Sequence, residues 1–130
     1  MNHRATCCAA LSIAAAAFLL TTPGPGADQL ELWRHRNLGK AFFETPTTVA
    51  QAPAELKKAL DLAPDSVRDR LNYGLALLRA GDVEQSIPEL VAVQKRDASL
   101  PHTWFNLGIA YKRQRMYAEA IRQFEGMAAR

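Results

Sequence analysis

The sequence predicts an all-α protein made of stacked antiparallel helix pairs. A glycine recurs at a nearly constant interval, with 35 residues from Gly39 to Gly74 and 34 from Gly74 to Gly108, each time within the pattern Asn-x-Gly. Apolar residues around the third glycine recur at helical spacing. A period of this length with two helices per unit is typical of arrays in which each unit packs only on its neighbours. We therefore expect three units, with boundaries at residues 28–66, 67–100 and 101–130.

The first 27 residues have the layout of a secretory signal peptide. A positive start, Met1–Arg4, precedes an apolar run, Cys7–Leu20, and a stretch rich in proline and glycine, Thr21–Ala27. The apolar run is shorter than the roughly 20 residues that a membrane-spanning helix needs. Because Pro25 is unfavourable for cleavage after Ala27, an uncleaved N-terminal anchor is the alternative. We expect an exported chain, either periplasmic or extracellular, or one held at a membrane by this segment.

Composition excludes two classes of function. Both cysteines, Cys7 and Cys8, lie in the apolar run, so the rest of the chain has no disulfide and no thiol nucleophile. The net charge is +3, and basic residues alternate with acidic ones after residue 28. Proteins that bind nucleic acid usually gather basic residues on one face. We expect no nucleic-acid partner.

The first unit, 28–66, is expected to open with Asp28 as N-cap, because Asp28 and Glu31 resemble a capping box. One extra residue is expected in the turn between its two helices. Pro53 lies early in the second helix, where proline removes a hydrogen bond or kinks the helix unless it falls in the first turn.

In the second unit, 67–100, Ser66 and Asp69 form the next expected capping box. The dipeptide Gly81-Asp82 predicts a turn followed by a new N-cap. Pro88 raises the same question as the proline of the first unit.

The third unit, 101–130, is expected to begin at Pro101, whose missing N–H suits a first helical turn. Two apolar stripes at helical spacing are predicted to face each other, Trp104, Leu107, Ala110 and Tyr111 on one helix and Ala120, Ile121, Phe124 and Met127 on the other. The chain stops at Arg130 within the second helix, so we expect this unit to be incomplete and to expose an apolar face. A longer protein, a partner or a second copy is expected to cover that face.

The third unit resembles the tetratricopeptide repeat (TPR) family, on the spacing of Trp104, Leu107, Gly108, Tyr111, Ala120 and Phe124. The first two units depart from it, with His35 and Arg70 at the tryptophan position, although Leu60–Pro64 closes the first unit as in the family. The resemblance implies a right-handed superhelix of three units with a concave groove lined by the first helix of each unit.

Three asparagines, Asn37, Asn72 and Asn106, precede the glycines by two positions and are expected to form a ladder along this groove. An amide both donates and accepts, so it can pair with the backbone of an extended peptide whatever its sequence. The arrangement resembles the asparagine ladder of the O-linked N-acetylglucosamine transferases. The alternative is that asparagine is simply common at this position.

Basic side chains are expected beside the ladder, namely Arg36, Lys40, Arg68 and His102. They resemble in part the carboxylate clamp of chaperone-associated TPR domains, which implies an acidic peptide as one option. The alternative is an ordinary solvated face. The cluster Lys112, Arg113 and Arg115 is expected to interact with the helix dipole.

No catalytic, metal or cofactor motif is evident. The three histidines, His3, His35 and His102, form no His-x-x-x-His pair, and no phosphate-binding glycine loop is present. We expect a non-enzymatic scaffold, without cofactors, that binds a protein or peptide. The alternatives are a substrate-recruiting arm of a larger enzyme or an oligomerising structural module.

A narrower resemblance covers residues 35–42, 46–48 and 100–111. These stretches resemble bacterial exported proteins that join TPR units to FG-GAP (VCBS) and ASPIC/UnbV segments.

Overall fold

The structure, a computed structural model, describes residues 25–130. The predicted signal residues up to 24, with Cys7, Cys8 and His3, lie outside this range. The described residues form one short 3-10 helix, η1, and six α-helices: α1 (Pro25–Glu44), η1 (Val49–Gln51), α2 (Ala52–Leu62), α3 (Val67–Ala80), α4 (Val83–Arg96), α5 (Pro101–Arg113) and α6 (Tyr117–Ala128). None of these helices of residues 25–130 has the length and apolar character required to cross a bilayer.

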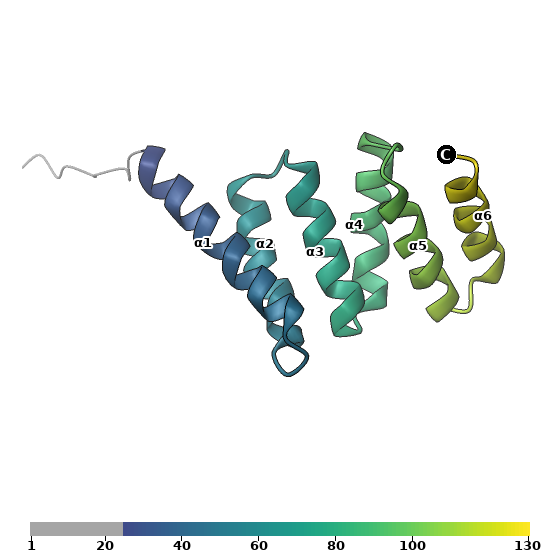
Figure 1. The fold of residues 1–130 in the computed structure, drawn as a ribbon, viewed down its shortest axis with the longest axis horizontal. Helices are drawn as coiled ribbons and strands as arrows, with labels where there is room; N and C mark the ends of the chain where they lie inside the picture. The colour runs from purple at the N-terminus through teal and green to yellow at the C-terminus, as the bar shows by residue number, and fades with distance from the viewer. Residues whose placement is uncertain (1–24) are drawn as a thin grey trace, which may run out of the picture.

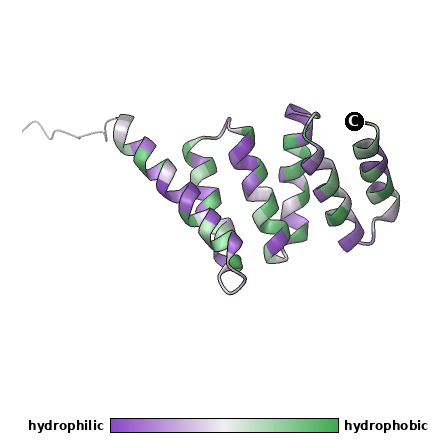
Figure 2. Cartoon of the chain, viewed as in Figure 1, coloured by the Kyte–Doolittle hydropathy of each residue, from purple (hydrophilic) through white to green (hydrophobic). Residues whose placement is uncertain are grey.

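The helices follow one another in chain order along the long axis of the molecule (Figure 1). Helices α1 and α2 pack as a pair, as do α3 and α4, and α5 and α6, while α2 contacts α3 and α4 contacts α5. Hydrophilic and hydrophobic segments are interspersed along the helices (Figure 2), as expected for helices that bury one stripe. The predicted all-α stack of helix pairs is confirmed.

The repeated glycines allow the two helices of each pair to cross closely. Each faces a large side chain of the second helix in its pair: Gly39 faces Leu56, Gly74 faces Leu90 and Gly108 faces Phe124. A Cβ at Gly39 would lie 2.5 Å from Leu56 Cγ, and one at Gly108 would lie 2.5 Å from Phe124 Cε1. No side chain fits at such distances, which explains why glycine recurs at this position of each unit.

The extra residue of the first unit lies in the turn, as expected. Gly39 and Leu56 are 17 positions apart, whereas Gly74 and Leu90 are 16 apart. The additional turn is η1, which directly precedes α2. It also places Pro53 in the first turn of α2, where proline needs no hydrogen-bond donor.

Pro88 lies inside α4, beyond the first turn. Its ring removes the hydrogen bond that residue 88 would donate to the carbonyl of Glu84. Both residues are exposed, so water can reach the Glu84 carbonyl.

Two clusters of buried apolar residues join neighbouring pairs. One cluster joins α2 to α3 through Ala52, Leu56, Leu60, Tyr73, Ala76 and Leu77, and a second joins α3 and α4 to α5 through Leu78, Leu90, Leu107 and Ala110. Each fully buried leucine contributes about 2 kcal/mol of transfer free energy. Stability therefore depends on contacts between units as much as within them.

In the first two units, polar contacts occur at the position that Trp104 occupies in the third unit. His35 Nδ1 lies 2.6 Å from Glu55 Oε2 and joins α1 to α2, and Arg70 Nη1 donates to Glu89 Oε2 at 2.8 Å and joins α3 to α4. At the same position in the third unit, Trp104 packs over Gly126, where a Cβ would lie 2.4 Å from its ring. The residue at this position therefore connects the two helices of each pair. His35 and Arg70 do so through polar contacts, and Trp104 does so by packing.

The start of the first helix differs from the prediction. Helix α1 begins at Pro25, so Asp28 lies in its first turn and not at an N-cap, and the predicted Asp28 N-cap is wrong. The predicted signal boundary after Ala27 falls within this helix. Glu31 accepts a hydrogen bond from Arg34 instead.

The second predicted capping box forms in half. The Asp69 N–H donates to Ser66 Oγ at 3.2 Å and caps α3, but the Asp69 carboxylate binds Arg36 of α1 instead of completing the box. Asp82 caps α4 by accepting from the Gln85 N–H, as predicted.

One residue of the predicted apolar stripes points elsewhere. Ala120 is buried, whereas Ile121 is 55% exposed. Ile121 therefore lies at the surface of α6 and not in the core.

The turn between α5 and α6 has the same backbone conformation as the turn between α3 and α4, but its residues are less suitable for the left-handed position and for the N-cap position. Gly81 has a φ of 98°, and Arg115, one repeat later, has a φ of 61°. In both turns the next N–H donates to a carbonyl of the preceding helix at 2.9 Å, from Asp82 to Leu77 and from Met116 to Tyr111. Met116 stands at the N-cap position of α6 without a side-chain cap.

Replacing Arg115 with Gly and Met116 with Asp should stabilise the protein. The left-handed conformation costs a non-glycine residue about 1 kcal/mol, and an Asp N-cap contributes about 1 kcal/mol. We expect the double variant to raise the free energy of unfolding in urea by about 1–2 kcal/mol. Arg115→Ala is the control, because it removes the same charge and keeps the backbone strain. Equal stability of R115G and R115A would contradict the assignment of strain to this turn.

Candidate functional site

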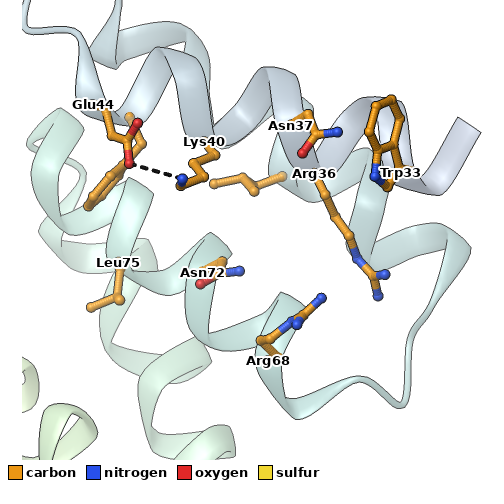
Figure 3. A pocket seen from close by; sticks show the side chains of 10 residues that line it. Trp33, Arg36, Asn37, Lys40, Glu44, Arg68, Asn72 and Leu75 are labelled. Carbon is orange, nitrogen blue, oxygen red and sulfur yellow. Dashed lines mark ion pairs between the residues drawn. The ribbon is translucent and has the colours of Figure 1, made fainter.

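A groove runs along the first helices of the units. Its first part lies between α1 and α3, has a volume of about 500 Å³ and is shown in Figure 3. Its lining residues are Trp33, Arg36, Asn37, Lys40, Phe43, Glu44, Leu56, Arg68, Asn72 and Leu75. Apolar side chains thus share this part of the groove with amides and charged groups.

The second part of the groove, of about 390 Å³, continues from α3 to α5. It is lined by Phe43, Leu75, Leu78, Arg79, Phe105, Asn106, Ile109 and Arg113. Phe43 and Leu75 line both parts, so the two form one continuous surface. We call this surface the inner groove.

All three asparagines of the predicted ladder line the inner groove, Asn37 and Asn72 in its first part and Asn106 in its second. Asn106 Nδ2 donates to the His102 carbonyl of its own helix at 2.7 Å. Within residues 25–130 the amides of Asn37 and Asn72 form no hydrogen bond, so both their donors and acceptors face the groove unused.

Arg36 lines the groove, but its guanidinium is held by Asp69. Nε donates to Asp69 Oδ1 at 2.8 Å and Nη2 donates to Oδ2 at 2.5 Å, a bidentate pair between α1 and α3. The Asp69 side chain is fully buried. Burial alone would raise the pKa of Asp69, but the hydrogen bonds from Arg36 and Ser66 outweigh it and hold that pKa below its ordinary value of 3.8.

The other predicted cations differ in their surroundings. Lys40 lies 3.5 Å from Glu44, and both side chains are largely exposed, so this pair is weak. Arg68 is exposed and makes no ion pair within the part of the chain that the structure describes. His102 is exposed in the first turn of α5 and lines neither part of the groove. Arg68 is therefore the predicted cation most available to an anionic ligand.

Several groove residues were not among the predicted site residues. Trp33 is 63% exposed at one end of the groove. It lies one helical turn before Asn37, and this spacing could have identified it. At the junction of the two parts, the Arg79 guanidinium lies 4.7 Å from the Phe43 ring centroid.

Arg113 belongs to the basic cluster assigned to the dipole of its own helix. Its Nη1 instead donates to the Leu78 carbonyl in the last turn of α3, at 2.8 Å. It therefore connects α5 to α3 beside the second part of the groove.

The lining of the inner groove suits binding. Among the described residues that form it there is no Ser, Cys or His side chain, and its carboxylate, Glu44, is paired with Lys40. Two amides with unused donors and acceptors, an apolar floor and an available guanidinium are complementary to a polypeptide segment.

Comparison with known proteins supports the fold. No family model matches the chain, and no curated protein matches it. Among solved structures, the crystal structure of the TPR domain of FLU from Arabidopsis superposes with a TM-score of 0.69 and 21% sequence identity, over 78% of this chain and 95% of that one. The chain therefore has a TPR-like fold, as predicted. The narrower resemblance to proteins with FG-GAP and ASPIC/UnbV segments stays a prediction.

Replacing Asp69 with Asn should weaken the connection between the first two units. The half-buried Arg36 guanidinium would lose its charged partner, and we expect the free energy of unfolding at pH 7 to fall by about 2 kcal/mol. Because the folded-state pKa of Asp69 is lowered, its contribution is present above its ordinary pKa of 3.8 and is lost as the pH falls through the folded value.

The loss of stability upon acidification should therefore be smaller in D69N than in the wild type. Urea titrations at a series of pH values measure this, and Asp65→Asn, which alters a carboxylate that is 96% exposed, is the control. A D69N variant with wild-type stability across that range would contradict the role of the pair.

Proposed function

We propose that the chain is a protein-interaction module that binds an extended peptide along the inner groove. The observation that carries this proposal is the position of Asn37 and Asn72. They line the same 500 Å³ space, on neighbouring first helices, with no internal partner for either amide among the described residues. A binding role requires no catalytic group.

The two amides suit the backbone of an extended chain. Each offers one carbonyl oxygen and two N–H donors, the complement of a peptide unit. Side chains of the bound segment alternate in direction, so every second one would contact the apolar floor formed by Phe43, Leu56 and Leu75. The ladder would fix the backbone, and the floor would favour apolar residues at alternate positions.

Charge gives the groove a direction. Arg68 lies beside Asn72, and Glu44 lies towards the opposite end, next to Lys40 (Figure 3). A carboxylate is favoured near Arg68, and it is not favoured near Glu44. Arg36 supports the site by holding Asp69 and contributes less charge to a ligand. The proposed ligand therefore has an acidic group near Arg68 and an apolar or aromatic side chain near the exposed indole of Trp33.

Peptides selected from a random library on the purified protein provide the probe. Replacing both Asn37 and Asn72 with Ala removes the proposed backbone contacts, each worth about 0.5–1.5 kcal/mol, so affinity should fall roughly tenfold or more. Asn106→Ala is the matched control and should have a smaller effect, because its amide is already bonded within α5. Unchanged affinity of the double variant in calorimetric titrations would remove the ladder from this proposal.

Arg68→Glu should change selectivity more than stability, since its side chain is exposed. We expect acidic peptides selected on the wild type to bind R68E at least about tenfold more weakly, and the salt dependence of binding to decrease. Arg122→Glu, on α6 and outside the groove, is the control. Equal loss in both variants would mean that the overall charge, and not Arg68, attracts the peptide.

A further inference from the structure

Within residues 25–130, the first and last helices expose faces whose equivalents are buried between units. One face of each first helix packs towards the preceding unit. In α5 this face carries Thr103, Leu107 and Ala110, all at 0% exposure, and in α3 it carries Asp69, Tyr73 and Ala76, which are also buried. In α1 the equivalent residues are Arg34, Leu38 and Ala41, and all three are exposed. Among residues 25–130, the same helical face is therefore buried in α3 and α5 and exposed in α1.

The opposite end has the complementary surface. In α4, the residues Val83, Ile87 and Val91 pack against the cluster that contains Leu107 and Ala110 of α5. One repeat later, the equivalent residues of α6 are Tyr117, Ile121 and Glu125. Tyr117 is 59% exposed and Ile121 is 55% exposed. Nothing within residues 25–130 covers them.

The exposed faces of α6 and α1 carry residues at the positions that are equivalent to those in contact between α4 and α5. Leu38 and Ala41 stand at the positions of Leu107 and Ala110, the residues that α5 places against α4. A second copy of the chain therefore carries, on α1, the apolar pair equivalent to the one that packs on α4. Both surfaces belong to one molecule but are different from each other, so their contact is head to tail.

Charge supports the same partner. A short turn joins α4 to α5, so the two helices run antiparallel. The start of α5, at Thr103, therefore lies towards the C-terminal half of α4. In the contact between copies, Arg34 takes the position of Thr103 and Glu125 takes the position of Val91. The residues at these two positions therefore carry opposite charges, although Arg34 also pairs with Glu31 of its own helix.

We propose that α6 of one copy binds α1 of a second copy, and that the chain assembles head to tail through this contact. The contact extends the stack as a further unit would. It does not involve Asn37, Asn72 or Arg68, so it is independent of peptide binding, and it aligns the inner grooves of successive copies.

The test is a mixing experiment on the whole chain, as isolated from the expressing cell, with its N-terminus established by mass spectrometry. Leu38→Glu blocks the α1 surface, and Ile121→Asp blocks the α6 surface. The mass in solution of the wild type should rise with concentration, while each variant alone should stay monomeric. An equimolar mixture of the two variants should form a dimer of about twice the mass of one chain, because each supplies the surface that the other lacks.

The double variant L38E/I121D is the matched control and should stay monomeric in every mixture. Ala41→Glu replaces L38E if circular dichroism shows that L38E does not fold, since Ala41 is exposed. A wild type that is monomeric at all concentrations overturns the proposal. So does a mixture of the single variants that fails to dimerise, or a double variant that still associates, because the contact would then lie elsewhere.

Discussion

The close approach of two helices at a glycine is the constraint on which the rest of the structure depends. At Gly39, Gly74 and Gly108 no Cβ would fit without moving the facing side chain. Because the same contact recurs in each pair, the first helices present the same face at each step along the stack. The inner groove is a consequence of that repetition, because equivalent residues of the first helices line up along the stack.

The contacts between units explain why particular side chains near the groove differ in availability. Arg36 and Arg113 both lie along the inner groove, but one binds Asp69 and the other binds the Leu78 carbonyl. Their charges hold first helices together, α1 to α3 and α3 to α5. The residues that remain open, the Asn37 and Asn72 amides and the Arg68 guanidinium, are those that the stack does not use. A division of this kind separates the groups that shape the groove from those proposed to bind a ligand.

The sequence predicted the fold well, because the period, the glycines and the turn residues are local signals. The Asn-x-Gly pattern located the three pairs, and Ser66 and Asp82 located two helix starts correctly. The predicted start of α1 was wrong, because Pro25 at the first position of the helix competed with the capping box at Asp28. The site was predicted in part. Five of the seven candidate residues meet in one part of the groove, but the Arg36–Asp69 pair joins residues 33 positions apart, which no local pattern indicates.

The side-chain amide signals of Asn37, Asn72 and Asn106 in an NMR titration with a selected peptide test the central claim most directly. The signals of Asn37 and Asn72 should shift and become protected from exchange with water as the peptide binds, because their amides would bond to its backbone. The Asn106 signal should change less, since its Nδ2 is already bonded to the His102 carbonyl. A peptide that binds while the Asn37 and Asn72 signals stay unchanged would contradict binding along the ladder.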